Sequence, residues 1–371
     1  MKSIGVMWKT VSEDCNLACD YCYYSNCKGR PEAKVNRIER SLLDKVIEEM
    51  MQKAAGGTAS FAWQGGEPLL AGIDFFREVV SLQAMHAVPP VNISNALQTN
   101  GTLIDEEWAR FFKRYNFLLG VSLDGPQSIH NARRLTGSGK GSFDLVMHGI
   151  NHLRAADVDF NILTVIHEGN VTKARQLMEF YEQEGFRYVQ FIPCMDFRAQ
   201  ETGSAAKYRI TPQQYGEFLC EAFDCWYNGG QPRISIRFFD NMLGMNMNQE
   251  AELCIHRSSC PQTLILEQNG DAYPCDFYMA ESYKLGNVGS DSLDTILSSP
   301  VYREFLAMKA RLPAACLQCP YLKLCHGGCP RNRVWSPAED KPGVDYFCNS
   351  YQMIFAYAQT RMLRLASQLF Q

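Results

Sequence analysis

Three cysteines near the start of the chain have a spacing that could hold a metal cluster. Cys15, Cys19 and Cys22 form the pattern Cys-x3-Cys-x2-Cys. A [4Fe–4S] cluster held by only three cysteines leaves one iron open to a substrate or cofactor. The alternative is a zinc site that borrows a fourth ligand, such as Cys27, because structural zinc is closed by four protein ligands.

Eight more cysteines lie between positions 254 and 348. Their spacing is Cys254-x5-Cys260-x14-Cys275, then Cys316-x2-Cys319-x5-Cys325-x3-Cys329, and last Cys348. Eight thiols are the count for two four-cysteine sites, which can be iron–sulfur clusters or the two zinc sites of a module that binds partners without catalysis. Of the 15 cysteines, this leaves Cys27, Cys194, Cys220 and Cys225, and we expect the last three to pack in the core.

The composition limits the class of protein and its compartment. The chain has 371 residues, a formal net charge of -4 and 46% hydrophobic residues, so it can bury a large core and carries no strongly basic surface for nucleic acid. Met1–Val11 lacks the pattern of a signal peptide, and no apolar run is long enough to span a membrane. We therefore expect a cytoplasmic protein, in which disulfides are rare and clustered cysteines bind metal.

The first two-thirds of the chain alternates strand and helix patterns. The expected strands are Ile4–Val11, Thr58–Gln64, Asn92–Thr99, Phe117–Ser122, Phe160–Val165 and Tyr188–Ile192, and the expected helices are Ser41–Gln52, Ile73–Met85, Asp105–Arg114, Ser142–Ala156 and Val171–Glu184. This alternation indicates βαβ units and a parallel sheet. Six units fall short of a closed eight-unit barrel, so we predict an α/β partial (β/α)6 barrel, with an open doubly wound sheet as the alternative.

The composition and the expected elements change in the last third of the chain. We expect a helix at Thr211–Trp226, a strand at Ile234–Phe238 and a polar, methionine-rich stretch at Gly244–Gln249. Residues 254–348 are rich in Cys, Gly and Pro, with one helical interruption at Asp291–Ala310, and such a segment needs metal to hold it together. Tyr351–Leu369 has the pattern of a closing amphipathic helix. The predicted domains are 1–235, 236–350 and 351–371.

Four of the expected strands end in polar or glycine-rich groups. These are Gln64-Gly65-Gly66-Glu67-Pro68, Gln98-Thr99-Asn100-Gly101, Ser122-Leu-Asp124-Gly125-Pro126 and Pro193-Cys194-Met195. Ligands of parallel α/β folds bind at the carboxyl ends of the strands. The sequence therefore predicts a ligand site at this edge, close to the first cysteine cluster.

The first cluster and these strand ends resemble the radical S-adenosylmethionine (SAM) family. The resemblance is carried by Cys15-x3-Cys19-x2-Cys22 with Tyr21 before the third cysteine, and by the Gly-Gly-Glu-Pro stretch. It implies that the open iron binds SAM and that SAM is cleaved to a 5′-deoxyadenosyl radical, in a partial (β/α)6 barrel. By the same resemblance, the candidate SAM contacts are Tyr21, Gly66, Ser122, Arg134 and Met195.

The later cysteines resemble the SPASM domain of radical SAM peptide-modifying enzymes. Gly270-x4-Cys275 followed by the Cys-x2-Cys-x5-Cys-x3-Cys run carries this resemblance. It implies two auxiliary clusters and so three [4Fe–4S] clusters in all. Auxiliary cluster I would bind Cys254, Cys260, Cys275 and Cys329, and auxiliary cluster II would bind Cys316, Cys319, Cys325 and Cys348.

Within that group the chain looks most like anaerobic sulfatase-maturating enzymes. The matching stretches are Ser60-Phe-Ala-Trp-Gln-Gly-Gly-Glu, Leu97-Gln-Thr-Asn-Gly-Thr-Leu-Ile-Asp, Gln190-Phe-Ile-Pro-Cys194 and Tyr273-Pro-Cys275-Asp276-Phe277-Tyr278. The resemblance implies oxidation of a Cys or Ser in a sulfatase to Cα-formylglycine, with Asp276 as the base. A carboxylate beside an anionic cluster is expected to bind its proton more tightly, which suits a base.

The implied partners are a peptide or protein substrate and an external one-electron donor such as flavodoxin or ferredoxin, with no nucleic acid and no membrane. The alternative function is a SPASM maturase that forms thioether or other crosslinks in a ribosomally made precursor peptide. The chain shows no separate peptide-recognition domain before Cys15, which favours the sulfatase hypothesis modestly.

Overall fold

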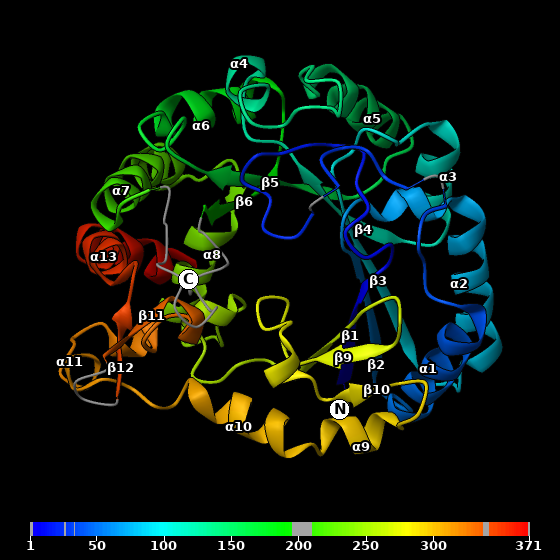
Figure 1. Ribbon diagram of the computed structural model, residues 1–371. Helices are drawn as coiled ribbons and strands as arrows, with labels where there is room; N and C mark the ends of the chain where they lie inside the picture. Colours follow the sequence, from blue (N-terminus) through cyan, green and yellow to red (C-terminus); the bar gives the residue numbers. More distant parts are fainter. Residues whose placement is uncertain (1–2, 26, 33, 195–209, 337–340, 370–371) are drawn as a thin grey trace. The chain divides into compact units, whose positions relative to one another are not determined.

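The computed structural model describes residues 3–25, 27–32, 34–194, 210–336 and 341–369, and Figure 1 shows their path. Contacts between residues divide the chain into two compact units. The first consists of Met1–Leu123, His130–Phe160 and Gln262–Phe305, and the second of Asp124–Ile129, Asn161–Pro261 and Leu306–Gln371. Each unit therefore combines segments that are far apart in the sequence.

The first unit is built on a mostly parallel sheet. Its strands are β1 (Ser3–Lys9), β2 (Thr58–Gln64), β3 (Asn92–Thr99), β4 (Phe117–Ser122), β8 (Thr263–Leu266), β9 (Asp271–Tyr273) and β10 (Gly286–Asn287), in the order β10-β9-β8-β1-β2-β3-β4. The short strand β8 pairs parallel to β1, with Val6 opposite Leu264, while β9 and β10 are antiparallel. This pairing brings residues after position 262 to the edge of β1, as the yellow and blue strands show (Figure 1).

Helices cover the sheet of the first unit and are anchored by aromatic contacts. They are α1 (Arg40–Lys53), α2 (Ile73–His86), α3 (Glu106–Arg114), α5 (Phe143–Ala155) and α9 (Leu293–Leu297). Asp105 caps α3, because its carboxylate accepts a hydrogen bond from the amide of Trp108 at 2.9 Å. Trp63 of β2 stacks on Trp8 at 5.5 Å between centroids and contacts Phe76 of α2 edge-on at 5.6 Å.

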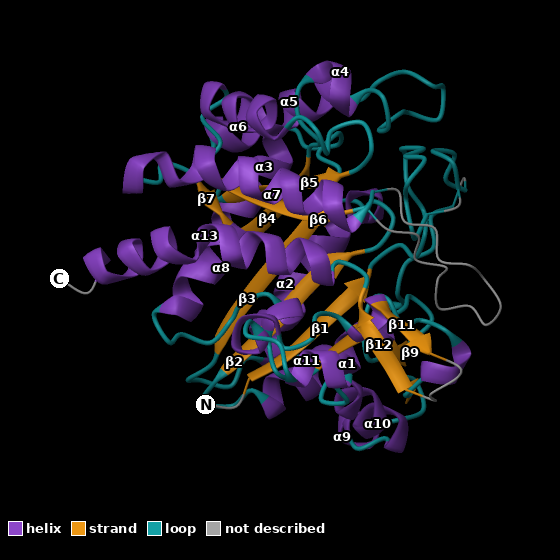
Figure 2. Cartoon of the chain, turned by 90° about the vertical axis from the view of Figure 1, so that its left-hand side faces the viewer, coloured by secondary structure: helices purple, strands orange, loops and turns teal. Residues whose placement is uncertain are grey.

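The second unit continues the strand–helix alternation and ends in small elements. It contains α4 (Gln127–His130), β5 (Phe160–Ile166), α6 (Ala174–Gln183), β6 (Tyr188–Pro193), α7 (Pro212–Tyr227), β7 (Ser235–Ile236), α8 (Arg237–Asn246), α11 (Ala314–Leu317), α12 (Leu322–Cys325), β11 (Arg333–Ser336), β12 (Lys341–Asp345) and α13 (Cys348–Leu369). Strands β5, β6 and β7 are parallel. Helix α13 packs on α7 and α8 (Figure 2), where Phe223 of α7 contacts Tyr357 of α13 edge-on at 6.4 Å between centroids.

The six predicted barrel strands are all present. Strands β2, β3 and β4 have the predicted bounds, β5 and β6 extend one residue further, and β1 ends at Lys9 rather than Val11. The parallel runs β1–β4 and β5–β7 do not close on themselves, which agrees with a partial barrel rather than a closed one. The predicted domain limits at 235 and 350 stay a prediction.

Two predictions in the last third are wrong. Only Ser235–Ile236 of Ile234–Phe238 is strand, because α8 begins at Arg237 and runs to Asn246. Asp291–Ala310 holds two helices, α9 and α10 (Pro300–Met308), since Pro300 lacks the amide hydrogen that a continuous helix needs and is well suited to a first turn.

The length and hydropathy of the helices bear on whether the chain could span a membrane. In the described part of the chain, none of them has the length and apolar character needed to cross a bilayer. The cytoplasmic location stays a prediction.

Candidate active site

Polar side chains at the ends of three neighbouring strands are linked to one another in the first unit. Lys9 ends β1 opposite Gln64, which ends β2. The Lys9 ammonium donates to Gln64 Oε1 at 3.3 Å, and Gln64 Nε2 donates to Gln98 Oε1 of β3 at 3.2 Å. The structure thus brings together the strand ends that the sequence singled out, as the geometry of parallel strands requires.

The three cysteines of the first cluster follow β1 in one loop. Cys15 is buried, Cys19 is half-buried and Cys22 is exposed. Burial, together with the charges of Glu67 and the other two thiols, raises the pKa of Cys15 far above its usual value. Metal supplies the positive charge that ionises such a thiol, so three thiols on one short loop are a suitable donor set for an iron–sulfur cluster.

Cys27 lies against this loop through hydrogen bonds to its backbone. Its sulfur donates to the carbonyl of Cys15 at 2.9 Å and accepts from the amide of Cys15 at 3.2 Å. Asn100 Nδ2 approaches the sulfur of Cys15 at 3.7 Å and donates to Asn16 Oδ1 at 2.9 Å. Cys15 is therefore fixed from two sides before any metal binds.

The Gly-Gly-Glu-Pro stretch packs directly on the cysteine loop. Gly66 has φ +42°, and a Cβ there would lie 1.8 Å from the backbone oxygen of Asp14. Only glycine permits this approach. The amide of Glu67 donates to the same oxygen of Asp14 at 2.7 Å, which joins the loop after β2 to the loop after β1.

The side chain of Glu67 ties its own loop, after β2, to the end of β3. Its carboxylate, fully buried, accepts hydrogen bonds from the amide of Leu69 at 3.1 Å, the hydroxyl of Thr99 at 2.8 Å and the amide of Asn100 at 2.7 Å. Burial raises the pKa of Glu67 to about 7, and these three donors act in the opposite direction. The sequence named this stretch for its glycines and did not identify the carboxylate as a linking group.

Four of the five predicted SAM contacts lie in described residues of the first unit. Arg134 is buried, and its guanidinium lies 5.4 Å from the ring centroid of Tyr21. The amide of Ala18, in the cysteine loop, donates to the carbonyl of Leu135 at 2.6 Å. Gly66 lies in the loop after β2, and the buried Ser122 is the last residue of β4. Met195 lies outside the described residues. Their contact with SAM stays a prediction.

Asp276, the predicted base, has two partners that the sequence did not reveal. Its Oδ1 forms an ion pair with the ammonium of Lys9, and its Oδ2 accepts a hydrogen bond from the hydroxyl of Tyr23 at 2.5 Å. The side chain of Lys9 has no exposed surface, and that of Asp276 is 12% exposed. Burial and the charge of Asp276 raise the pKa of Tyr23 well above its usual value, so its hydroxyl stays a proton donor.

A second tyrosine–carboxylate pair lies beside the first. The hydroxyl of Tyr24 donates to Glu267, and the ammonium of Lys9 lies 4.2 Å from the centroid of the Tyr24 ring. Burial, opposed by the Tyr24 hydrogen bond and the charge of Lys9, raises the pKa of Glu267. Lys9 therefore has a carboxylate, an aromatic face and an amide oxygen around its one charge.

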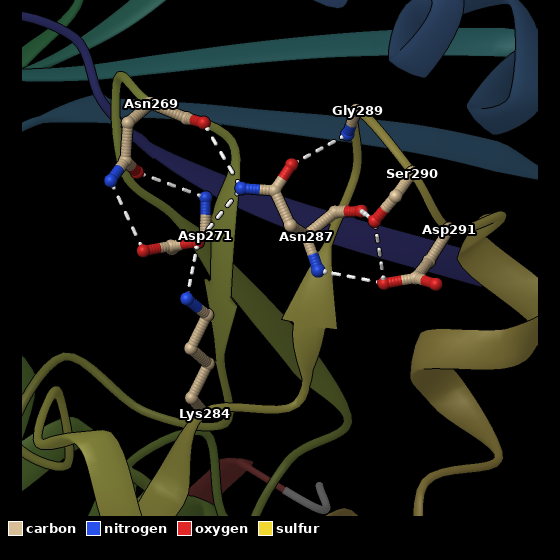
Figure 3. Close-up of polar contacts among 7 residues, drawn as sticks. All are labelled: Asn269, Asp271, Lys284, Asn287, Gly289, Ser290 and Asp291. Carbon is tan, nitrogen blue, oxygen red and sulfur yellow. Dashed lines mark hydrogen bonds and ion pairs between the residues drawn. The ribbon is translucent and has the colours of Figure 1, made fainter.

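A hydrogen-bonded hairpin places Cys275 and Asp276 after β9. Figure 3 shows its turn, in which Asp271 accepts from Lys284 at 2.8 Å, from Asn287 at 2.8 Å and from Asn269 at 3.1 Å. Burial by itself raises the pKa of Asp271, but these donors outweigh it and hold the pKa below its usual range. The turn is thus ordered by a charged network immediately before the cysteine and the candidate base.

The four thiols predicted for auxiliary cluster II lie together in the second unit. Cys316, Cys319, Cys325 and Cys348 line one cavity, whose wall also includes Tyr351 and Phe355. Among the described residues, no three Cys, His, Asp or Glu side chains converge on a point as around a single metal ion. Four thiols around one apolar cavity are a suitable donor set for a cluster held by four cysteines.

Three of the four thiols predicted for auxiliary cluster I lie in the second unit, together with one buried cation. Cys254, Cys260 and Cys329 all interact electrostatically with Lys309, which is 1% exposed. The ammonium of Lys309 donates to the carbonyl of Cys254 at 2.5 Å. The fourth predicted ligand, Cys275, belongs to the first unit. The remaining thiols are not part of these groups: Cys194 is buried, and Cys220 and Cys225 are half-buried on α7.

Comparison with known proteins now bears on both groups of cysteines. Residues 10–181 match the Radical SAM superfamily, and residues 258–320 match the iron–sulfur cluster-binding SPASM domain. The cysteine-type anaerobic sulfatase-maturating enzyme of Clostridium perfringens (strain 13 / Type A) is 35% identical, over 100% of both chains. This chain belongs to the anaerobic sulfatase-maturating enzyme family of radical SAM proteins.

Other members of this family extend the match. The serine-type anaerobic sulfatase-maturating enzyme of Bacteroides thetaiotaomicron is 34% identical over 97% of this chain and 91% of its own. A solved structure, native anSMEcpe with bound AdoMet and Kp18Cys peptide, has a TM-score of 0.89 at 32% identity, with 99% of each chain covered. The predicted α/β radical SAM fold with a SPASM domain, and the cofactors SAM and [4Fe–4S] with additional clusters in SPASM, are confirmed at the level of the family.

Proposed function

We propose that this chain oxidises a cysteine or serine side chain of a sulfatase to Cα-formylglycine under anaerobic conditions. Support comes from relatives named for both the cysteine type and the serine type, which match nearly the whole chain at similar identity. The observation that carries the proposal is the position of Asp276, which is one residue after a proposed cluster ligand and has both an ammonium and a phenol on its carboxylate.

When bound, SAM and the clusters supply the radical that removes a Cβ hydrogen atom and the acceptor for the second electron. The chain supplies the rest. Asp276 takes the thiol or hydroxyl proton of the substrate, Tyr23 holds its second oxygen, and Lys9 balances its charge. The substrate loses one hydrogen atom, one proton and one electron, which gives an aldehyde from serine and a thioaldehyde from cysteine; water converts the thioaldehyde to the aldehyde and hydrogen sulfide.

The eleven proposed cluster cysteines and the four described SAM candidates complete the site. In the proposed arrangement, Gly66 lets the loop after β2 pack on the backbone of Asp14 beside the cysteine loop, and Arg134 lies over the ring of Tyr21 in that loop. We also propose an external one-electron donor, such as flavodoxin or ferredoxin, because each radical formed from SAM consumes one electron. Reduction by either protein, followed by cleavage of SAM, tests this part of the proposal.

Asp276→Asn tests the role of the base. Wild-type enzyme, reduced and given SAM with short Cys- and Ser-containing sulfatase-motif peptides, should form an aldehyde that a hydrazide traps for mass spectrometry. In Asp276→Asn the clusters and the cleavage of SAM should remain while the aldehyde is lost. Asp294→Asn, an exposed carboxylate of the same unit, is the matched control and should retain full turnover. Full turnover by Asp276→Asn would remove the base assignment.

The same experiment separates the crosslinking alternative. SuiB of Streptococcus suis shares the fold with this chain, with a TM-score of 0.66 at 16% identity, and this likeness carries no function. A peptide product that has lost mass but does not react with the hydrazide would identify a crosslink instead of formylglycine. The peptide that reacts, cysteine or serine, also assigns the type of this enzyme.

A further inference from the structure

Asn100 lies directly after β3, and the proposed reaction gives its side chain no role. The residue is 8% exposed, and its Nδ2 donates to the sulfur of Cys15 at 3.7 Å. Both residues belong to the first unit, and Cys15 is a proposed ligand of the SAM-binding cluster. Groups that hydrogen-bond to the ligands of a metal site tune the metal as well as orient the ligands. Asn100 is therefore in a position to act on the cluster itself.

The neighbouring backbone fixes which end of the carboxamide faces Cys15. The amide of Thr102, which can only donate, lies 3.0 Å from Oδ1 of Asn100, and the Thr102 hydroxyl donates to the same oxygen at 2.7 Å. Nδ2 of Asn100 donates to Oδ1 of Asn16 at 2.9 Å, and Nδ2 of Asn16 donates to the hydroxyl of Thr102 at 2.9 Å. These bonds close a ring in which the Asn100 oxygen is occupied, so the side chain presents N–H groups to Cys15.

Backbone amides donate to the ligand sulfurs of the same loop. The amide of Leu17 donates to the sulfur of Cys15 at 3.4 Å, and the amide of Ser25 donates to the sulfur of Cys22 at 3.2 Å. A side-chain substitution leaves these amides in place, whereas it can remove the N–H groups of Asn100. The contribution of one hydrogen bond to sulfur can therefore be measured while the backbone donors remain.

We propose that Asn100 raises the reduction potential of the SAM-binding cluster by donating a hydrogen bond to the sulfur of Cys15. The potential of an iron–sulfur cluster depends on the hydrogen bonds that its sulfurs accept. Reduction transfers one electron from the external donor to the cluster, so the ligand sulfurs become more negative and accept the bond from Asn100 more strongly. The bond thus stabilises the reduced form more than the oxidised form. This inference rests on the proposed function for its ligand Cys15 and its electron donor, whereas the potential itself requires no substrate.

The test is a redox titration of the full-length, reconstituted enzyme, followed by electron paramagnetic resonance in the absence of SAM and peptide. Asn100→Leu and Asn100→Ala both remove the N–H groups, and leucine keeps nearly the same volume, so that water does not take their place. We expect Asn100→Leu to shift the one-electron equilibrium of the SAM-binding cluster about tenfold toward the oxidised form, which corresponds to a potential lower by about 59 mV. Asn100→Ala should shift it in the same direction, and the auxiliary clusters should stay at their wild-type potentials.

Two controls separate the hydrogen bond to sulfur from a general disturbance of the loop. Thr102→Val removes the hydroxyl from the ring of hydrogen bonds but leaves the Thr102 amide that orients Asn100, and it should keep the wild-type potential. Asn151→Leu is the matched control, because it replaces an exposed asparagine on α5 of the same unit. A potential lowered as far in Thr102→Val as in Asn100→Leu would overturn the proposal.

The outcomes distinguish this inference from the proposed function. An unchanged potential in an Asn100 variant that retains its iron overturns the role of Asn100, and so does loss of the SAM-binding cluster from both variants, which would make the residue a structural support. A lowered potential in an enzyme whose wild type forms no aldehyde supports the role of Asn100 and refutes the sulfatase function. Formation of aldehyde by the wild type, together with an unchanged potential in Asn100→Leu, supports the sulfatase function and refutes the role of Asn100.

Discussion

The hydrogen bond between Tyr23 and Asp276 gives a sharp test of how the candidate base is positioned. Tyr23→Phe removes the hydroxyl that donates to Asp276 Oδ2 at 2.5 Å and leaves the ion pair with Lys9 in place. Tyr23 as a whole residue is 37% exposed, and its ring retains the contact with Phe277, at 5.7 Å between centroids, so the fold should be little affected. The variant therefore loses only the hydrogen bond that fixes Oδ2 of Asp276.

The expected magnitude follows from the charge of the acceptor. A hydrogen bond to a charged group contributes about 1.5 to 3 kcal/mol. About 1.4 kcal/mol changes a rate tenfold. If this bond fixes the carboxylate in its reactive orientation, Tyr23→Phe should lower the rate of aldehyde formation between roughly 10-fold and roughly 150-fold. The initial rate of SAM cleavage should stay near that of the wild type, because Tyr23 acts after the radical has formed.

The matched control is the adjacent tyrosine. Tyr24→Phe also removes a hydroxyl that donates to a carboxylate, but that carboxylate belongs to Glu267. The assay measures trapped aldehyde and 5′-deoxyadenosine in the same samples, so that the ratio of the two reports coupling. Equal losses of this ratio in both variants, or an unchanged ratio in Tyr23→Phe, would refute the assignment of Tyr23 as the residue that positions Asp276.

Three further predictions concern the loops around the first cluster. Because the folded pKa of Glu67 is about 7, above its usual value near 4.5, the folded protein should lose stability progressively as the pH rises from about 5 to about 7. Glu67→Gln should remove up to about 3 kcal/mol of this pH dependence. The measurement is the melting temperature against pH, whose curve should be flatter in the variant than in the wild type. Gly66→Ala should lower SAM affinity at least tenfold in equilibrium binding, because its Cβ would lie 1.8 Å from the Asp14 oxygen. Cys27→Ser should keep the full iron content, since serine can form both hydrogen bonds to the Cys15 backbone, and loss of one whole cluster would instead make Cys27 a ligand.

The parts of the site that follow single strands could be predicted from the sequence. Gln64, Gly66 and Ser122 lie at or just after strands whose alternation and length are strong signals, and the rule for parallel strands then places them on one edge. The cysteine spacings identified the loops that carry thiols in the same way. Local pattern and a general rule of topology were sufficient for these residues.

The pairs around Asp276 could not be predicted, because they depend on which strand lies beside β1. The Tyr23–Asp276 and Tyr24–Glu267 bonds join residues 253 and 243 positions apart. They form because β8, a strand of only four residues, pairs with β1. Nothing in so short an apolar run specifies its partner. The one usable signal was Lys9, a charged residue that interrupts an apolar strand next to Trp8.

Lys9 also changes the argument for how Asp276 works. The expectation from sequence relied on an anionic cluster next to the carboxylate, but the group that the structure places in contact with it is a cation with no exposed surface. The ion pair fixes one carboxylate oxygen of Asp276 and the hydrogen bond from Tyr23 fixes the other, so both partners hold the candidate base in one orientation.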